Sequence, residues 1–367
     1  MKITSLQLRN FRNFASCSFQ LSEGVTIFLG ENAQGKTNLL EAVSFLSTTR
    51  SHRVQDESLC IRSSFGSANL EVQIEEDGSR FTLAAVLHKE GKTLLYQNQP
   101  VSRTSEFIGK LNAVLFSPSD MDLFETSPRY RRKMMDVEMG KISVSYMNHL
   151  NRYLKVLKER NAYLKQKSIE DSYLEVLTSQ CIEAQLEIIR MRKKFVDEIN
   201  DYLQDYYRQI SLSENKVIAL YVGPVETDGD VRQSLIEKYE KSRERDLVFK
   251  LTHVGVHRDD ITFLMDVQPV IETASQGQKR ILILAIKCSL VKLIEKNTHR
   301  QPVLLLDDVL SELDAKRRTA LFETLDPSLQ TLITTTDIQD VEKWIKAKAK
   351  VFYVENGKVT FRKEEVR

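Results

Sequence analysis

One octapeptide near the N-terminus has the residue types and spacing of a loop that holds phosphate groups. Its glycines let backbone N–H groups curl around phosphate oxygens, its lysine can reach the β and γ oxygens, and its threonine hydroxyl can ligate Mg²⁺. The octapeptide fits G-x-x-x-x-G-K-[ST] and lies between an apolar run and a helical pattern, as such a loop must. The sequence therefore predicts a site for ATP and Mg²⁺ at Gly30, Glu31, Asn32, Ala33, Gln34, Gly35, Lys36 and Thr37.

Two adjacent carboxylates follow the apolar run P-V-L-L-L and supply the distant acidic partner that a phosphate-binding loop needs. Asp307 is the candidate Mg²⁺ ligand beside Thr37. Asp308 can accept a hydrogen bond from the attacking water and position it as a general base would, with Lys36 and Ser275 as the other catalytic residues. The alternative is that the acidic pair caps the S-E-L-D segment that follows it.

A third segment, S-Q-G-Q-K-R, directly precedes a long apolar helical pattern. A serine cap, a glycine that allows close approach and a free helix N-terminus make an anion-binding end. An ordinary helix cap explains this hexapeptide as well when it is taken alone. Its position between the phosphate loop and the acidic pair favours a functional role for Ser275, Gly277 and Gln278.

The order of these motifs is that of ABC-type ATPase heads, and the chain resembles the RecF family of bacterial recombination and gap-repair ATPases over nearly its whole length. The chain departs from the family pattern at Ser119, Met121 and Val256, where glutamate, leucine and proline are more usual. None of these positions is a phosphate ligand. The other segments that carry the resemblance are N-F-R-N-F at Asn10–Phe14, R-S-H-R at Arg50–Arg53, L-F-S-P-S-D at Leu115–Asp120, S-P-R-Y-R-R at Ser127–Arg132, H-R-D-D at His257–Asp260 and S-E-L-D at Ser311–Asp314.

The resemblance implies an α/β P-loop ATPase head, with a mixed sheet and flanking helices, that forms a head-to-head dimer. Ser275 and its helix end would contact the γ-phosphate held by the other subunit, and ATP hydrolysis would dissolve the dimer. Many ABC-type heads carry a histidine where this chain has Thr334–Asp337, so the resemblance gives this segment a role in sensing the γ-phosphate.

The implied function is an ATP-dependent, DNA-binding switch in recombinational repair and replication-fork maintenance. Its ATPase would be slow and stimulated by DNA, and it would support recombinase loading at single-strand gaps and the SOS response. The implied partners are a second copy of the chain, the RecO and RecR proteins, and single-stranded, gapped or double-stranded DNA without sequence specificity.

Alternating short strands and helices must position these motifs, and this pattern predicts a parallel α/β sheet. Residues 1–115 are rich in strands, with a hairpin turn at Asp77-Gly78. From Lys141 to Val222 there is no glycine or proline, and apolar residues recur at alternating threes and fours, which predicts an antiparallel helical pair forming a short arm of roughly 50 Å. The expected organisation is an ATPase lobe at 1–115, a helical lobe with the arm at 116–250, and the rest of the ATPase lobe at 251–367.

The net charge is only +2, but positive charge is concentrated in one segment of the chain. Residues 128–167 contain eleven Lys and Arg residues against three acids, a local balance of +8, so the rest of the chain sums to −6. A binder of the DNA backbone needs such a patch, because affinity scales with the number of phosphates neutralised. A solvated helix face is the alternative. The candidate DNA contacts are Arg131, Arg132, Arg152, Lys155 and Lys158, with Arg50 and Arg53 as a second edge.

The composition excludes several other classes of protein. Of 367 residues, 41% are hydrophobic and 28% charged, as in ordinary globular proteins, and the longest clean apolar run, Ile281–Ile286, is far short of the roughly 18 residues that span a membrane. Four scattered cysteines fit neither a zinc cluster nor a disulfide framework and suggest the cytoplasm.

Three other P-loop functions remain as alternatives. A transporter subunit would not need the 238 residues between Thr37 and Ser275. A small-molecule kinase would not need S-Q-G-Q or S-E-L-D. A chromosome-organising ATPase head would carry a longer coiled coil than this arm.

Overall fold

The computed structural model describes residues 1–346 and 349–361, and the chain divides into two compact units. These bounds differ from those expected, because residues 251–275 belong to the helical unit. The cause is strand pairing: β10 (Asp260–Met265) pairs along its whole length with β9 (Val217–Val222). Unit 1 contains Met1–Met121, Asp205–Glu214 and Gln276–Arg367, and unit 2 contains Asp122–Gln204 and Asn215–Ser275.

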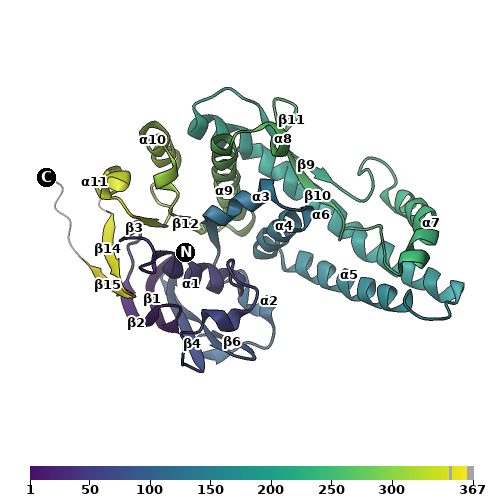
Figure 1. Cartoon of the computed structure of the whole chain (residues 1–367), viewed down its shortest axis with the longest axis horizontal. Helices are drawn as coiled ribbons and strands as arrows, with labels where there is room; N and C mark the ends of the chain where they lie inside the picture. Colours follow the sequence, from purple (N-terminus) through teal and green to yellow (C-terminus); the bar gives the residue numbers. More distant parts are fainter. Residues whose placement is uncertain (347–348, 362–367) are drawn as a thin grey trace. The chain divides into compact units, whose positions relative to one another are not determined.

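A mixed six-stranded sheet forms the centre of unit 1 (Figure 1). Its order is β15-β14-β3-β13-β12-β8, and every neighbouring pair is parallel except β14 with β15. All five positions of β12 and of β13 are buried, as expected where strands are covered on both faces. The predicted α/β fold is confirmed. The strands are β3 (Val25–Leu29), β8 (Ala113–Phe116), β12 (Val303–Asp307), β13 (Thr331–Thr335), β14 (Lys350–Glu355) and β15 (Lys358–Phe361).

The strand-rich N-terminal segment forms a second, antiparallel sheet in unit 1, with the order β2-β1-β4-β5-β6-β7. The β4–β5 turn consists of Asp77 and Gly78, both with positive φ, so it is the tight hairpin turn that the sequence predicts. The strands are β1 (Lys2–Phe11), β2 (Phe14–Gln20), β4 (Ser67–Glu76), β5 (Ser79–His88), β6 (Gly91–Tyr96) and β7 (Gln99–Pro100).

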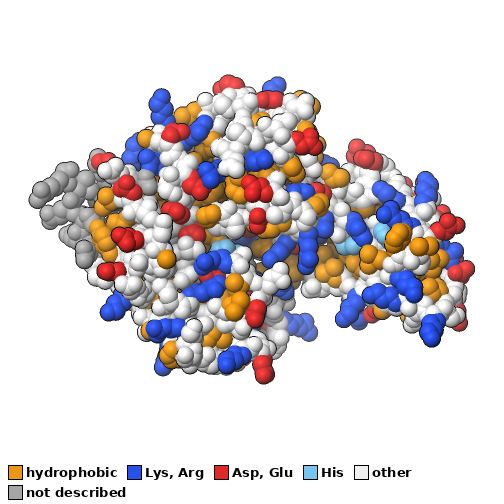
Figure 2. All heavy atoms as spheres, in the orientation of Figure 1, with side chains coloured by type: hydrophobic (Ala, Val, Ile, Leu, Met, Phe, Trp, Pro, Cys, Tyr) orange, Lys and Arg blue, Asp and Glu red, His pale blue; other side chains and the backbone are white. Residues whose placement is uncertain are grey.

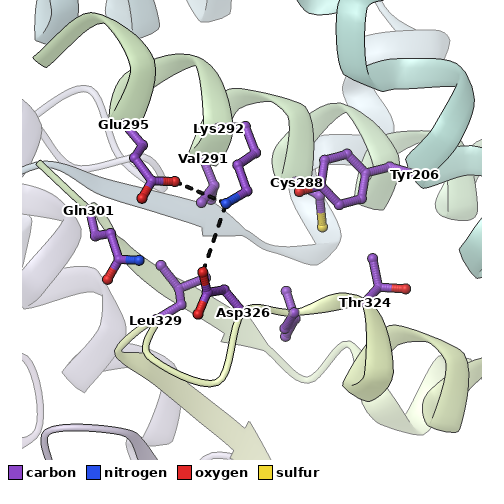
Figure 3. Close-up of a pocket in the computed structure, with 10 residues that line it drawn as sticks. Tyr206, Cys288, Val291, Lys292, Glu295, Gln301, Thr324, Asp326 and Leu329 are labelled. Carbon is purple, nitrogen blue, oxygen red and sulfur yellow. Dashed lines mark hydrogen bonds and ion pairs between the residues drawn. The ribbon is translucent and has the colours of Figure 1, made fainter. Parts of the chain in front are cut away.

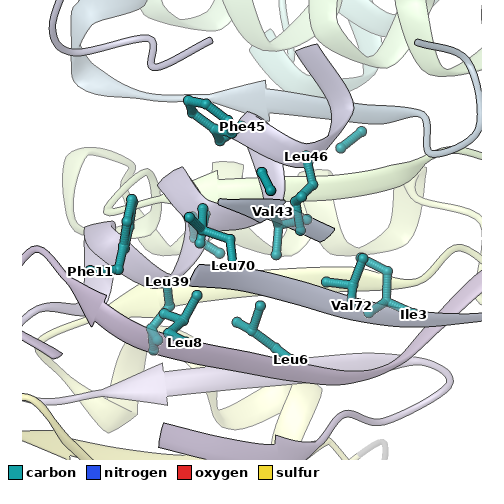
Figure 4. Packing of buried hydrophobic residues seen from close by; sticks show 14 of the residues in the cluster. Ile3, Leu6, Leu8, Phe11, Leu39, Val43, Phe45, Leu46, Leu70 and Val72 are labelled. Carbon is teal, nitrogen blue, oxygen red and sulfur yellow. The ribbon is translucent and has the colours of Figure 1, made fainter. Parts of the chain in front are cut away.

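Helix α1 (Lys36–Thr48) lies between the two sheets of unit 1, since it contacts β4 and β5 of one and β8, β12 and β13 of the other. Figure 4 shows Leu39 and Val43 of α1 packed against Leu8 of β1 and Leu70 of β4, and all four side chains are fully or almost fully buried. Burial of these side chains holds the start of α1, and with it the phosphate loop, in a fixed place.

The remaining helices of unit 1 are one long helix and several short ones. The long helix, α9, contacts β8 and begins within the S-Q-G-Q segment. These elements are η1 (Glu57–Cys60), α2 (Thr104–Phe107), η2 (Pro118–Met121), α9 (Gln276–Thr298), η3 (Leu310–Glu312), α10 (Ala315–Thr324), η4 (Ile338–Val341) and α11 (Glu342–Lys346).

Unit 2 is mainly helical and contains the predicted helical pair, α5 and α6. Arg160 Nε donates to Thr178 Oγ1 near the turn between them, and Arg192 Nε donates to Tyr146 OH far from it, so the two helices are antiparallel. At about 1.5 Å per residue the 41 residues of α6 span about 60 Å. The elements are α3 (Asp122–Glu125), α4 (Pro128–Ile142), α5 (Val144–Tyr163), α6 (Asp171–Ser211), α7 (Val231–Phe249), α8 (Val270–Thr273), β9, β10 and β11 (Gln268–Pro269).

No helix within residues 1–346 and 349–361 is both long and apolar enough to cross a membrane.

Candidate functional site

The phosphate loop leaves the end of β3 and enters α1 through two positions that only glycine can occupy. A Cβ on Gly30 would lie 2.3 Å from the carbonyl oxygen of Val354. Gly35 has a φ of 113°, and a Cβ there would lie 2.5 Å from the side chain of Asn13. Both glycines are therefore required by the path of the loop itself, which curls its backbone as a phosphate cradle requires.

The side chain of Lys36 lies within the curl of this loop. Its Nζ donates to the carbonyl oxygens of Gly30, at 2.7 Å, and of Glu31, at 2.8 Å. Burial lowers the pKa of Lys36, and the charges of Asp308 and Asp307 partly oppose this shift. The loop thus holds a cation next to backbone N–H groups, an arrangement that attracts a polyanion.

The two residues predicted to bind Mg²⁺ meet at one carboxylate oxygen. Thr37 Oγ1 donates to Asp307 Oδ1 at 2.9 Å, and Thr334 Oγ1 donates to the same oxygen at 2.8 Å. Burial raises the pKa of Asp307, while the two hydroxyl groups act to lower it. The ends of β12 and β13 and the start of α1 together bring these three side chains to one point.

Asp308 carries an acceptor atom that the protein does not satisfy. Its Oδ1 is buried and has no hydrogen-bond partner among the residues that the structure describes. Its backbone has a φ of 54°, and its N–H donates to Thr334 Oγ1 at 2.9 Å. The N-cap of η3 is Val309 and that of α10 is Asp314, so the alternative assignment of the acidic pair as a helix cap is wrong.

Lys36, Thr37, Asp308 and Thr334 line one cavity of about 350 Å³, a size typical of small-molecule sites, and Asp307 is hydrogen-bonded to two of them, Thr37 and Thr334. A buried carboxylate oxygen without a partner costs free energy, so the orphan Oδ1 of Asp308 indicates that the cavity takes a donor such as water. A hydroxyl next to a carboxylate fits Mg²⁺, which takes few protein ligands and completes its shell with phosphate oxygens and water. The lining residues are Asn32, Ala33, Gly35, Lys36, Thr37, Asn38, Arg53, Asp308 and Thr334.

Sequence reasoning missed the residue that braces the loop from the β1–β2 turn. Asn13 Nδ2 donates to the carbonyl oxygen of Gln34 at 2.8 Å, and Asn38 Nδ2 donates to Asn13 Oδ1 at 2.9 Å. The β14–β15 turn adds a second brace, because the N–H of Asn356 donates to Gln34 Oε1 at 2.6 Å and that of Gly357 to the carbonyl oxygen of Gln34 at 3.2 Å. The only sequence feature that pointed to Asn13 was its place in the N-F-R-N-F segment.

Arg53, which the sequence predicts as a DNA contact, lines the nucleotide cavity. Its Nη1 donates to Asn38 Oδ1 at 2.8 Å and lies 3.4 Å from Glu41 Oε2. Glu41 is fully buried and also accepts two hydrogen bonds from Arg12 and one from Ser51. Burial raises the pKa of Glu41, but these hydrogen bonds and arginine charges outweigh it and hold the pKa below its usual value.

The S-Q-G-Q segment lies at the start of α9, where Ser275, Gln276 and Gly277 are exposed. A Cβ on Gly277 would meet nothing within 4 Å in the described part of the chain. Packing within the described part of the chain therefore does not explain why position 277 is a glycine. Farther along α9, Arg280 Nε forms an ion pair with Glu312 Oε2 in the S-E-L-D segment, at 3.0 Å.

Two of the arginines assigned to DNA are instead part of the internal structure of unit 2. Arg131 is 4% exposed, and its Nε and Nη2 each donate to the carboxylate of Asp260 at 2.8 Å. Arg132 is half-buried and donates to the carbonyl oxygen of Asp259 at 2.6 Å. Asp260 of the H-R-D-D segment neutralises Arg131, and the backbone of Asp259 holds Arg132, which a count of charges along the chain could not reveal.

The other basic candidates are exposed. Arg152, Lys155 and Lys158 on α5 are accessible to solvent, and so is Arg50 after α1. Among the described residues, the structure shows no hydrogen bond or ion pair of these four side chains.

A second cavity in unit 1 is too small to be a ligand site (Figure 3). It measures about 10 Å³, room for one water molecule at most. Lys292 lies at its edge, 3.0 Å from Glu295 and 3.9 Å from Asp326. This cavity is a packing gap beneath an ion-pair network.

Comparisons with known proteins extend along the whole chain. Residues 2–360 match a family model described as the RecF/RecN/SMC N terminal domain. The DNA replication and repair protein RecF of Pediococcus pentosaceus is 36% identical over 374 residues, covering all of both chains. That of Lactobacillus delbrueckii subsp. bulgaricus is 35% identical over 374 residues, covering 99% of this chain and 98% of the relative.

Solved structures give the same result. The recombination mediator protein RecF with ATP, of the RecFOR pathway, superposes with a TM-score of 0.90 at 29% identity, over 98% of this chain and 97% of that one. The Smc head bound to the C-terminal winged-helix domain of ScpA superposes with a TM-score of 0.57 at 15% identity, over 99% of this chain and 97% of that one, which indicates a shared fold alone.

Proposed function

This chain belongs to the RecF family, within the wider family of RecF/RecN/SMC N-terminal domains, and from that membership we propose that it is an ATP-dependent DNA-binding protein of DNA replication and recombinational repair. The observation that carries the proposal is the cavity in which the phosphate loop, the Thr37–Asp307 pair and the orphan Oδ1 of Asp308 come together. Such a cavity binds and hydrolyses a nucleoside triphosphate.

Each side chain of the cavity has a separate task in this proposal. Lys36 exchanges its two carbonyl partners for phosphate oxygens when ATP binds, and Thr37 and Asp307 hold Mg²⁺. The metal ion neutralises charge that develops on the phosphates. Asp308 accepts a hydrogen bond from the attacking water and orients it, while the hydroxyl group of Thr334 holds the carboxylate of Asp307 and the backbone N–H of Asp308. Thr334 thus gives the Thr334–Asp337 segment a positioning role in addition to the proposed sensing of the γ-phosphate.

The nucleotide drives head-to-head dimerisation in this proposal. Ser275, Gly277 and Gln278 reach the γ-phosphate held by the partner subunit, where a helix N-terminus and a glycine permit close approach. The exposure of Gly277 and the open space around it support this role, because the glycine serves no packing purpose within its own chain. Hydrolysis then removes the group that joins the subunits, and the dimer comes apart.

DNA binds through exposed cations on α4 and α5 and the turn that follows them. Once the buried pairs of Arg131, Lys141 and Arg160 with acids and the half-buried Arg132 are set aside, seven exposed cations remain against two exposed acids, Glu159 and Glu170. This surface suits the phosphate backbone and supplies no base-reading pattern. The cations are Arg129, Lys133, Arg152, Lys155, Lys158, Lys165 and Lys167.

The cellular role follows from the relatives. The similar RecF structure is described as a recombination mediator of the RecFOR pathway, which supports RecO and RecR as partners of this chain. The protein then acts in the cytoplasm, supports recombinase loading at single-strand gaps and the SOS response, and uses a slow, DNA-stimulated ATPase as a switch.

The test is to measure the ATPase rate and the dimer fraction together, with and without gapped DNA. ATP is expected to raise the dimer fraction in sedimentation, and gapped DNA to raise the ATPase rate. Lys36→Ala is the matched control and should show neither response. If neither ATP nor DNA raises the dimer fraction, the chain is better explained as a P-loop kinase of small molecules.

A further inference from the structure

Unit 2 exposes an aromatic ring that lies outside every motif of the sequence. Phe249 is the last residue of α7, and 65% of its surface is exposed. The guanidinium group of Arg245, one helical turn earlier, lies 5.9 Å from the centre of the ring, and the ring of His253 meets it edge-on at 5.5 Å. The ring is thus held between two side chains while one face stays accessible to solvent.

The fold does not use this ring for its own stability. The buried side chains of α7 are Leu235, Tyr239 and Asp246, and the helix ends directly after Phe249 because Lys250 adopts a left-handed conformation with a φ of 54°. Burying a phenylalanine stabilises a protein by removing apolar surface from water, and most of that stabilisation is forgone here. An exposed ring with fixed neighbours is suited to contact with a ligand.

The end of α7 is fixed beside the last turns of α5. Asp246 accepts from Arg160 Nη1 at 2.8 Å, and the N–H of Thr252 donates to Asn161 Oδ1 at 2.8 Å. Figure 2 shows hydrophobic side chains next to Lys and Arg side chains over α5 and α7. The segment that contains Phe249 is therefore attached to the last turns of α5, the helix that also carries exposed cations.

The charged residues near Phe249 indicate which class of ligand the ring would contact. Lys241, Arg245 and Lys250 of α7 and its C-cap are exposed, and α5 contributes Lys155 and Lys158. Three acids, Glu159, Glu240 and Glu244, and two aliphatic side chains, Val248 and Leu251, are also exposed in this region. The excess of cations fits a polyanion, and aromatic rings in basic grooves stack on the bases of single-stranded nucleic acid, with arginine adding a cation–π contribution.

We propose that Phe249 stacks on an unpaired base of single-stranded DNA while Arg245 and the cations of α5 hold the neighbouring phosphates. This inference rests on the proposed binding of DNA and adds to it a site for the unpaired strand. Stacking tolerates any base, so the site provides recognition of a gap without recognition of sequence. The protein distinguishes gapped DNA from a blunt duplex because only gapped DNA offers a free base.

The test compares three variants on two DNAs, a fluorescein-labelled gapped duplex and a blunt duplex of the same length, by fluorescence anisotropy across a series of salt concentrations. Phe249→Ala is expected to weaken binding of the gapped duplex at least tenfold and to leave the blunt duplex and the salt slope unchanged. Phe249→Trp should retain the affinity of the wild type. Val248→Ala, at the neighbouring exposed position, should also retain it.

Three results would overturn the inference: unchanged binding of gapped DNA by Phe249→Ala, an equal loss on both DNAs, or an equal loss from Val248→Ala. The last would mark the surface as an apolar docking site for a protein. Failure of the wild type to bind either DNA would instead refute the proposed function. An ATPase rate equal to that of the wild type in Phe249→Ala would establish that the variant is folded.

Discussion

A single carboxylate oxygen, Asp307 Oδ1, connects three elements of the nucleotide site. It accepts hydrogen bonds from Thr37 on α1 and from Thr334 on β13, and Thr334 also accepts from the N–H of Asp308. The hydroxyl of Thr334 therefore controls the position of both acids. It has this effect although it lies 26 residues beyond Asp308 in the sequence.

Replacing Thr334 with valine keeps the volume of the side chain and removes these hydrogen bonds. We expect the turnover number for ATP to fall at least tenfold with little change in ATP affinity, because the phosphate loop is untouched while the acids lose their alignment. Turnover kinetics and ATP titration measure the two effects. Thr331→Val, at the other end of the same strand, is the matched control, and an equal loss there would argue against a specific role for Thr334.

His257 makes the stability of unit 2 dependent on pH. Its Nδ1 lies 2.6 Å from Tyr153 OH and its Nε2 3.1 Å from the carbonyl oxygen of Thr252, and burial lowers its pKa to about 4 from the ordinary 6.5. The unfolded chain therefore binds a proton that the folded chain does not. The stabilising contribution of neutral His257 is complete above pH 6.5 and is lost as the pH falls toward 4.

Between pH 7.5 and pH 5 this histidine is expected to account for about 2 kcal/mol of lost stability. Urea denaturation at the two pH values should show a smaller loss for His257→Gln than for the wild type, whatever the stability of the variant at pH 7.5. His52, with a pKa also lowered to about 4 by burial, contributes equally to both proteins. Identical losses in the two proteins would contradict the assignment.

At the scale of elements, the β1–β2 turn fixes the phosphate loop from outside it. Asn13 is bonded to both Gln34 and Asn38, on either side of Gly35. We expect Asn13→Ala to weaken ATP binding about tenfold with a small effect on stability, because the loop loses a brace while the core is unchanged. ATP titration and urea denaturation check this together. Ser16→Ala on β2 should change neither quantity, and full ATP affinity in Asn13→Ala would refute the brace.

Helices α4 and α5 carry both exposed and buried cations. Substitutions should weaken DNA binding at the exposed positions and stability at the buried ones. Lys155→Glu and Lys158→Glu are each expected to reduce the slope of log K against log salt for DNA binding by about 1, since each removes one phosphate contact, and to spare ATP binding. Arg131→Ala should instead destabilise unit 2 by about 3–5 kcal/mol, because it leaves Asp260 half-buried without its partner. A DNA-specific loss in Arg131→Ala with normal stability would contradict this division.

At the scale of the whole molecule, the sequence predicted what depends on local spacing. The phosphate loop, the strand before Asp307 and the Asp77-Gly78 hairpin each follow from short local patterns, and the α5–α6 pair follows from a continuous pattern along residues 144–211. Pairings between distant residues could not be predicted. Arg131 meets Asp260 129 positions later. The contact of Arg53 with Asn38, 15 positions earlier, could not be predicted either, because it depends on how α1 and the loop after it fold together. A count of charges along the chain does not distinguish a buried ion pair from an exposed patch.

The partner of Asn161 could not be predicted from the sequence either. Its position in an apolar stripe of α5 resembles that of a residue that fixes the register of two helices. In the structure its Oδ1 accepts from the N–H and the hydroxyl group of Thr252, in the segment after α7. The side chain thus attaches the segment after α7 to α5. The unit boundary that was expected near residue 250 lies later in the chain, because residues 251–275 belong to unit 2.

In the proposed function, ATP binding assembles this protein into a dimer and hydrolysis, directed by Asp308, takes the dimer apart. The most direct test is sedimentation of Asp308→Asn with and without Mg²⁺ and ATP, beside the wild type and Lys36→Ala. Asp308→Asn is expected to bind ATP normally, to hydrolyse it at least a hundredfold more slowly and to accumulate as a dimer. Lys36→Ala should remain monomeric. An Asp308→Asn variant that is saturated with ATP and still monomeric would contradict the account.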